Sequence, residues 1–251
     1  MLKEPIYPTL KQKASAVARR IGPPSFYRAH KKELDRSLQT FSESKVLLRC
    51  RSYIDESKLH PAHGIQHGEM VAIEAGAILQ IESALGNRDR GKTEELMLCV
   101  QMAGLFHDIK RNEEDHTIKG GKEAEKILED FDLKKQYKRY IAAAIRNHEA
   151  FKKVLASEDE EAKLVSDSLY DADKFRWGPD NFTTTLWLIM ESSGTPAATL
   201  YRNFLEKMKG VGRIKETFRT ETGRRFGPEF IDLGIEIGNE IYREMGNLLG
   251  D

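Results

Sequence analysis

The sequence predicts an all-α protein. Apolar residues recur at three- and four-residue steps through most of the 251 residues, and this is the period of a helix. No segment shows a convincing alternation of apolar and polar residues, and no internal repeat is visible. A chain of this length can bury a sizeable core. We therefore expect one bundle of helices with additional helices at both ends.

The helical periods and the breaks between them define the expected elements. Pro61 and Gly64 mark a turn, Pro179 marks another break, and Ser25 is a suitable N-cap residue. The segment TETGRRFGPEF near the C-terminus reads as a turn-rich connection. The expected helices cover residues 9–20, 25–53, 66–85, 93–108, 116–131, 137–148, a stretch around 164–169, 183–191, 197–209 and 230–249.

Charge and cysteine content argue against several classes of protein. Lys plus Arg and Asp plus Glu both number 40, so there is no global electrostatic case for a nucleic-acid or anionic-membrane partner. The two cysteines, Cys50 and Cys99, do not suggest a disulfide framework. The first residues contain no apolar stretch typical of a signal peptide. We expect a cytoplasmic protein.

The stretch LMLCVQMAGLFHD, from Leu96 to Asp108, organises the rest of the chain. A helix that is apolar on nearly every side is normally a buried core helix, and this one is too short to span a bilayer. It ends in the adjacent pair His107 and Asp108, placed where the core should be. A buried charge must be paired, hydrogen-bonded or bound to a metal, so this pair requires partners elsewhere in the chain.

Histidines supply those partners. Five of the seven histidines lie between residues 60 and 116, and a sixth is His148. Imidazole suits zinc, iron, nickel and manganese, and carboxylates add oxygen ligands. The two oxygens of a carboxylate such as Asp108 can bridge two metal ions about 3.5–4 Å apart.

Several motifs together resemble the HD-domain superfamily, whose members are all-α metal-dependent phosphohydrolases. HGIQH opens a helix, an apolar helix ends in LFHDIK, and DADKF resembles the closing Ala-Asp-Lys/Arg element of that family. The resemblance covers roughly residues 59–180. It divides the chain into an N-terminal helical cap at 1–58, the HD-domain core at 59–180, and C-terminal helices at 181–251 packed on the same domain.

The resemblance implies a first metal site made by His67, His107, Asp108 and Asp173. His107 and Asp108 are also the residues that it implies to be catalytic. Asp171 is a rival for the last ligand, because DAD offers two carboxylates. We prefer Asp173 because it directly precedes a basic residue, as in the family element.

The resemblance also implies a second metal site. DHTIKGGKEAEKIL and IRNHEA resemble segments of two-metal members and contribute His116 and His148, with Asp108 as the bridge. The expected cofactor is one or two divalent ions, which could be Mn, Fe, Ni, Co, Zn or Mg. Lys110 and Arg111, next to the His-Asp pair, are candidates for holding the substrate phosphate. The role of His63 remains open. It is either a turn residue or a residue that supports the ligands or the substrate.

The expected function is attack by metal-bound hydroxide on a small phosphate ester or nucleotide. Two other functions remain open, a two-iron oxygenase and a non-catalytic nucleotide-binding protein. The sequence departs from the family because HDIK has lysine where a common two-metal pattern has glycine, and the signature of cyclic-dinucleotide phosphodiesterases is absent. The expected partner is a small phosphorylated substrate. We expect no membrane partner, and an oligomer remains possible.

Overall fold

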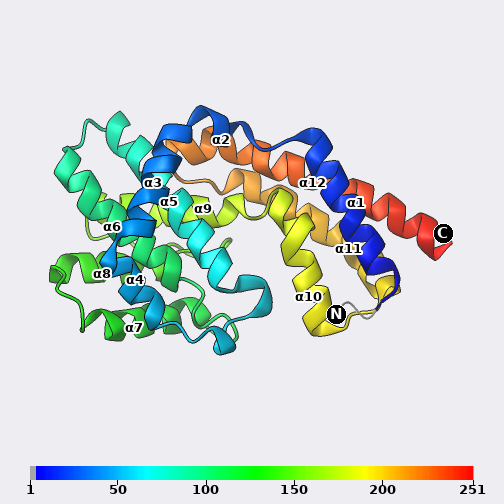
Figure 1. Ribbon diagram of the computed structural model, residues 1–251, viewed down its shortest axis with the longest axis horizontal. Helices are drawn as coiled ribbons and strands as arrows, with labels where there is room; N and C mark the ends of the chain where they lie inside the picture. The colour runs from blue at the N-terminus through cyan, green and yellow to red at the C-terminus, as the bar shows by residue number, and fades with distance from the viewer. Residues whose placement is uncertain (1–3, 251) are drawn as a thin grey trace.

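The computed structural model describes residues 4–250, and every regular element of that part of the chain is a helix, with no β-strand. The predicted all-α class is confirmed. Figure 1 shows α3 to α9 gathered at one end of an elongated molecule and α1, α10 and α11 at the other, with α12 running along both groups. None of the helices in the described range is long and apolar enough to cross a membrane.

Four helices form the centre of the larger group. Both α5 and α8 pack against α6 and α9, and α7 packs on α8. The C-terminal part of α6 is buried on nearly every side, as its apolar run predicts. The four central helices are α5 (Ile65–Leu85), α6 (Arg90–Phe106), α8 (Lys135–Arg146) and α9 (Glu160–Phe175), and the helix packed on α8 is α7 (His116–Leu128).

The N-terminal helices divide between the two groups. Of these, α1 packs against α12, whereas α3 packs against α5 and α4 against α6. The prediction of one helix over residues 25–53 is wrong. The helical backbone is interrupted at His30 and again at Ser44, whose side chain caps α4. The elements are α1 (Ile6–Ile21), α2 (Ser25–Ala29), α3 (Lys31–Glu43), α4 (Lys45–Ser52) and the 3₁₀ turns η1 (Glu56–Lys58) and η2 (Pro61–His63).

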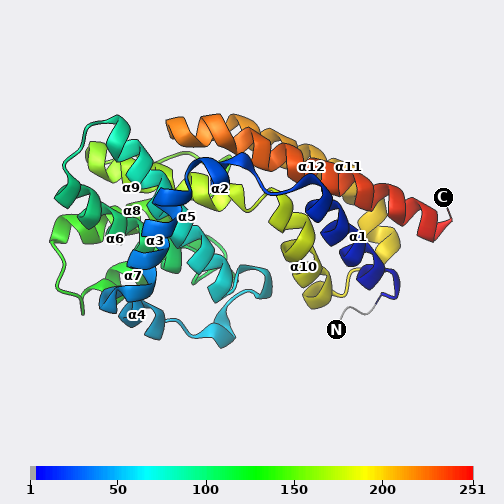
Figure 2. The same cartoon turned by 45° about the horizontal axis from the view of Figure 1, so that its top comes forward.

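The C-terminal elements extend the molecule beyond α9. A π-helical turn leads into α10, which lies against η2, and α11 packs along α12. Figure 2 shows α11 and α12 side by side above α10. These elements are η3 (Asn181–Thr185), α10 (Leu186–Ser193), α11 (Ala197–Arg213), η4 (Ile214–Glu216) and α12 (Glu221–Leu249).

The segment expected to be turn-rich is instead the beginning of α12. Thr220 caps this helix by accepting a hydrogen bond from the amide of Gly223, and the helix continues through Pro228. The glycines serve packing, since a Cβ on Gly227 would lie 2.3 Å from the ring of Phe218. A glycine required for close contact therefore gave the same sequence signal as a glycine required for a turn.

Several other helix boundaries differ from the prediction, and two of them bear on the residues around His107 and His148. The central helix begins at Arg90, ahead of the expected Thr93, because the side chain of Asp89 caps it by accepting from the amide of Lys92. The helix expected to reach His148 ends at Arg146. His148 consequently lies in the segment after α8, and its direction is not set by the helical period.

The backbones of α5 and α6 approach closely at Gly104. A Cβ on Gly104 would lie 2.5 Å from the Cα and 2.7 Å from the nitrogen of Ala72, so only glycine fits. On the facing helix, a Cβ on Gly68 would lie 3.3 Å from the Gly104 carbonyl oxygen. This contact brings the first turn of α5 against the end of α6.

We predict that Gly104→Ala destabilises the protein by about 1–3 kcal/mol or more, because the added methyl group must push two backbones apart. The matched control is Gly210→Ala in α11, where a Cβ meets nothing within 4 Å. The control should be neutral or gain about 0.5–1 kcal/mol from helix propensity. Urea denaturation of both variants measures these changes, and equal stabilities would contradict the close contact.

Candidate metal centre

His107 and Asp108 follow directly on α6, and both are buried, with 1% and 5% of their surfaces exposed. The Nδ1 atom of His107 lies 2.7 Å from the carbonyl oxygen of Gly104. Because a carbonyl oxygen can only accept, Nδ1 carries the proton and donates it. In the neutral ring, the lone pair of His107 is therefore on Nε2, which faces the neighbouring ligand candidates.

His67 and Asp173 complete a first group of ligand atoms around His107. His67 lies in the first turn of α5, and Asp173 lies in the last turn of α9. The Nε2 atom of His67 is 3.2 Å from Nε2 of His107 and 3.4 Å from Oδ1 of Asp173. Oδ1 of Asp173 is 3.7 Å from Nε2 of His107. Ligands that bind one ion at about 2.0–2.2 Å have such separations, so this group could hold a metal.

The two oxygens of Asp108 face different histidines. Its Oδ2 atom is 3.4 Å from Nε2 of His107 and 3.9 Å from Nε2 of His67. Its Oδ1 atom is 3.3 Å from Nε2 of His148 and 3.9 Å from Nε2 of His116. The carboxylate thus joins the first group to a second one, which is the arrangement required of a bridging ligand.

Close packing of α7 on α8 brings His116 and His148 together. A Cβ on Gly121 would lie 2.8 Å from the Cγ of Arg146, so glycine permits the approach. His116 is the first residue of α7, and His148 follows the end of α8. The Nδ1 atom of His148 donates to the carbonyl oxygen of Ile145 at 2.7 Å, which leaves its Nε2 lone pair directed at Asp108.

The buried atoms of the cluster fit a cation. Asp108 Oδ1 and His148 Nε2 are both buried without a hydrogen-bond partner. An oxygen and a nitrogen that both present lone pairs at 3.3 Å repel each other unless a proton or a metal ion lies between them. The ends of α6 and α8 also lie at this site, and the negative end of a helix dipole favours positive charge. Mixed imidazole and carboxylate ligands suit a divalent transition metal.

The pKa values of two histidines, His67 and His116, favour the neutral form that binds metal, whereas Asp108 raises the pKa of His107 against the effect of burial. Burial lowers the pKa of His67 to about 4. Burial, followed by the nearby Arg111 guanidinium, lowers the pKa of His116 to about 4 as well. Both rings are therefore neutral near pH 7, so each has a lone pair, which in His116 accepts from Arg111 at 2.8 Å.

The carboxylates of the cluster are ionised. Burial acts to raise the pKa of Asp108, but the facing histidines, with His107 the largest contributor, hold that pKa well below its usual range. Burial likewise acts to raise the pKa of Asp173, and the Lys174 ammonium group outweighs it together with the histidines. Two anionic ligands are thus present at neutral pH.

Asp171, the rival of Asp173, has a different role. Its Oδ1 accepts from the amide of Arg219 at 2.9 Å, and its Oδ2 accepts from the amide and the hydroxyl of Thr220 at 2.8 and 2.7 Å. Burial raises the pKa of Asp171 to about 6. This carboxylate holds the connection into α12, whereas Asp173 lies among the histidines.

The two phosphate candidates lie in different surroundings. The Nη1 atom of Arg111 is 2.8 Å from Nε2 of His116 and 3.7 Å from Oδ1 of Asp108. The ammonium group of Lys110 is 3.4 Å from Glu113. Only Arg111 of these two contacts the ligand cluster.

His63 belongs to the cluster, a role that the sequence left open. It lies at the end of η2, and its Nδ1 atom is 2.8 Å from Oδ2 of Asp108. Together with His67 and Asp108, it forms a further group of three possible ligands. The spacing of four residues from His67 was the available signal, but Gly64 interrupts the helix that would have made this spacing meaningful.

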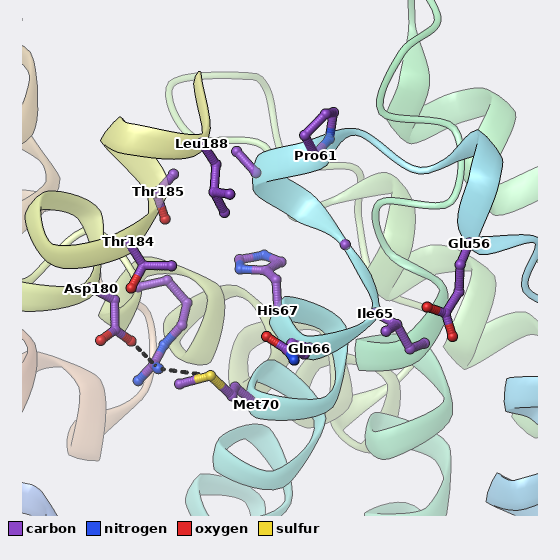
Figure 3. Close-up of a pocket in the computed structure, with 13 residues that line it drawn as sticks. Glu56, Pro61, Ile65, Gln66, His67, Met70, Asp180, Thr184, Thr185 and Leu188 are labelled. Carbon is purple, nitrogen blue, oxygen red and sulfur yellow. Dashed lines mark hydrogen bonds and ion pairs between the residues drawn. The ribbon is translucent and has the colours of Figure 1, made fainter. Parts of the chain in front are cut away.

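A cavity of about 400 Å³ opens beside His67. The walls come from η2 and α5 on one side and from η3 and α10 on the other, and Figure 3 shows the His67 ring between them. Apart from His67, the sequence did not predict these wall residues, because they come from segments far apart in the chain. The lining residues are Glu56, Pro61, Ala62, Gly64, Ile65, Gln66, His67, Met70, Arg176, Asp180, Thr184, Thr185 and Leu188.

We predict that Asp108→Ala removes bound metal while leaving the helical content largely unchanged. Within the described residues, this is the only carboxylate whose two oxygens face the two histidine groups. Elemental analysis of purified protein measures the metal, and far-ultraviolet circular dichroism measures the helices. Wild-type metal content in the variant would refute the bridging role.

We predict opposite effects for the two aspartates of the DAD motif. Asp173→Asn should lower the metal content, because an amide is a weaker ligand than a carboxylate. Asp171→Asn should keep the metal and lose about 1–3 kcal/mol of stability, because it weakens hydrogen bonds to the buried segment before α12. Metal analysis and urea denaturation of both variants separate these effects, and metal loss in Asp171→Asn alone would reverse the assignment.

Comparison with known proteins gives no match, whether with protein-family models, with curated proteins or with solved structures. The arrangement of the described residues is therefore the basis for any functional conclusion. What it establishes is an all-helical chain with a buried His/Asp cluster that could hold metal.

Proposed function

We propose that the chain is a metal-dependent phosphohydrolase that acts on small phosphate esters, as its resemblance to the HD-domain superfamily implies, and that it does so in the cytoplasm. The observation that carries this proposal is the position of Asp108, whose two oxygens face separate histidine groups. That arrangement favours two ions over one. The cavity beside His67 provides space for the organic part of a substrate.

The ligands divide into two sets that share Asp108. His67, His107 and Asp173 would hold one ion with it, and His116 and His148 would hold the other. When bound, divalent ions supply two things to phosphoryl transfer, a water molecule activated near neutral pH and compensation of the charge on the phosphate oxygens.

Positive side chains next to the ligands suit an anionic substrate. Arg111 lies against His116 and Asp108, where its guanidinium group can donate to phosphate oxygens. Lys174 is buried and paired with Asp173, so its role is to compensate the charge of that ligand. Lys110 is assigned a weaker role, because its contact is with Glu113.

The surroundings favour water as the nucleophile over a protein side chain. Both cysteines are buried outside the cavity wall, and burial raises the pKa of Cys50 and Cys99 to about 12. Neither thiol forms a thiolate near pH 7, so neither can act as a nucleophile. With both thiols excluded, the proposed reaction transfers the phosphoryl group to water in a single displacement.

We predict that metal-loaded protein hydrolyses phenyl phosphate, that a chelator abolishes the activity, and that Asp108→Ala lacks it. In ¹⁸O-labelled water, the label should appear in the released phosphate and not in the phenol, because water attacks phosphorus. Acid quenching during turnover of ³²P-labelled phenyl phosphate should recover no labelled protein, because no covalent intermediate forms.

Three outcomes would count against this proposal. A trapped phosphoprotein would replace the single displacement by a two-step mechanism. Substrate consumption that requires dioxygen, tested under anaerobic conditions with the iron-loaded protein, would establish the oxygenase alternative. Binding of nucleotides without turnover by any metal-loaded form would establish a binding protein.

A further inference from the structure

The cavity beside His67 offers no free cation for a second anionic group. Among the described residues that line it, Arg176 is the only lysine or arginine. Its guanidinium group is ion-paired with Glu74 and with Asp180, and its Nη2 also donates to the hydroxyl of Tyr27 at 2.6 Å. With 5% of its side chain exposed, Arg176 is committed to these partners.

Two carboxylates face the same space. Asp180 and Glu56 line the cavity with 39% and 61% of their side chains exposed, and Figure 3 shows them on opposite sides of His67. Arg51, the basic residue near Glu56, is 3.8 Å from it but only 3.2 Å from Glu69. One cation between two acids leaves this side of the cavity negative.

Uncharged hydrogen-bonding groups complete the polar part of the wall. Gln66 comes from α5, and Thr184 and Thr185 come from η3 on the facing side. In the described part of the chain, none of these three side chains is engaged in a hydrogen bond with another residue. Amide and hydroxyl groups that are free to pair can bind hydroxyl or carbonyl groups of a ligand.

We propose that the cavity selects substrates with a single phosphate and an uncharged organic part, and that Asp180 determines this specificity. The inference rests on the proposed function, because the single phosphate is taken to bind at the His/Asp cluster. A second phosphate on the organic part would meet Asp180 and Glu56, while Arg176 is already neutralised. The acidic wall therefore excludes the wrong ligand by repulsion.

Asp180→Asn tests this role because the change is nearly isosteric and removes one charge. It weakens the hold on Nη1 of Arg176, so the guanidinium group becomes available to a second anion, and it removes the repulsion from the wall. Both effects act in the same direction on specificity. Glu56→Gln should change the specificity in the same direction but to a smaller extent, because Glu56 is more exposed and far better screened by solvent. Asp232→Asn, an exposed acid on α12 outside the cavity, is the matched control.

The probes are propylphosphonate and propane-1,3-diphosphonate, which resist hydrolysis and differ by one anionic group at the far end. Isothermal titration of manganese-loaded protein gives the ratio of the two dissociation constants. We expect wild type and Asp232→Asn to bind the monophosphonate at least about tenfold more tightly, and Asp180→Asn to reduce that ratio about tenfold, as for one charge-assisted interaction. Metal analysis and circular dichroism of each variant verify that the centre and the fold persist.

The outcomes separate this inference from the proposed function. Equal affinity of wild-type protein for the two probes, or a ratio that Asp180→Asn leaves unchanged, would overturn the specificity role and leave hydrolysis at the cluster standing. If neither phosphonate binds to metal-loaded wild type, phosphate recognition at the cluster is wrong and both proposals fall. A reduced ratio in Asp180→Asn, with the control unchanged, supports the assignment.

Discussion

The close contact of α5 with α6 at Gly104 is the constraint on which the metal centre depends. Because no side chain separates the two backbones there, the first turn of α5 reaches the end of α6, and His67 meets His107. The carbonyl group of Gly104 then accepts the proton of His107 Nδ1 and turns the other ring nitrogen toward the cluster. One glycine thus sets both the distance between two ligand candidates and the orientation of one of them. The helices α7, α8 and α9 bring the remaining candidates to a position that this contact has already defined.

Much of the cluster could be predicted because buried polar groups need partners. An apolar helix that ends in His107 and Asp108 requires other polar residues around it, and the order of motifs along the chain pointed to His67, His116, His148 and Asp173. The structure brings these side chains together. The helical class could also be predicted, since apolar periods depend on local sequence. Helix ends were less predictable, because side chains such as Asp89 and Thr220 decide them.

The remaining features depend on contacts between distant segments. Gly223 and Gly227 read as turn residues, but they permit α12 to lie against Asp171 and Phe218, and only the packed structure reveals this use. His63 was ambiguous because its direction follows from the 3₁₀ turn before α5. The cavity could not be predicted at all, since its shape comes from the placement of η3 and α10 against η2. Local sequence patterns do not predict how distant segments are placed against one another.

His107 and His148 each donate Nδ1–H to the main-chain carbonyl group three residues earlier, where many metal-binding histidines use a carboxylate side chain. A main-chain acceptor cannot be removed by substitution, so the orientation of both rings tolerates mutation of the surrounding side chains. It is also uncharged, so it raises the basicity of the imidazole less than an aspartate would. Substitution of the residues that accept the Nδ1–H hydrogen bonds of these histidines would therefore change the metal preference of this centre little. The carboxylates, with their adjustable charge and geometry, are the positions through which such a change could be made.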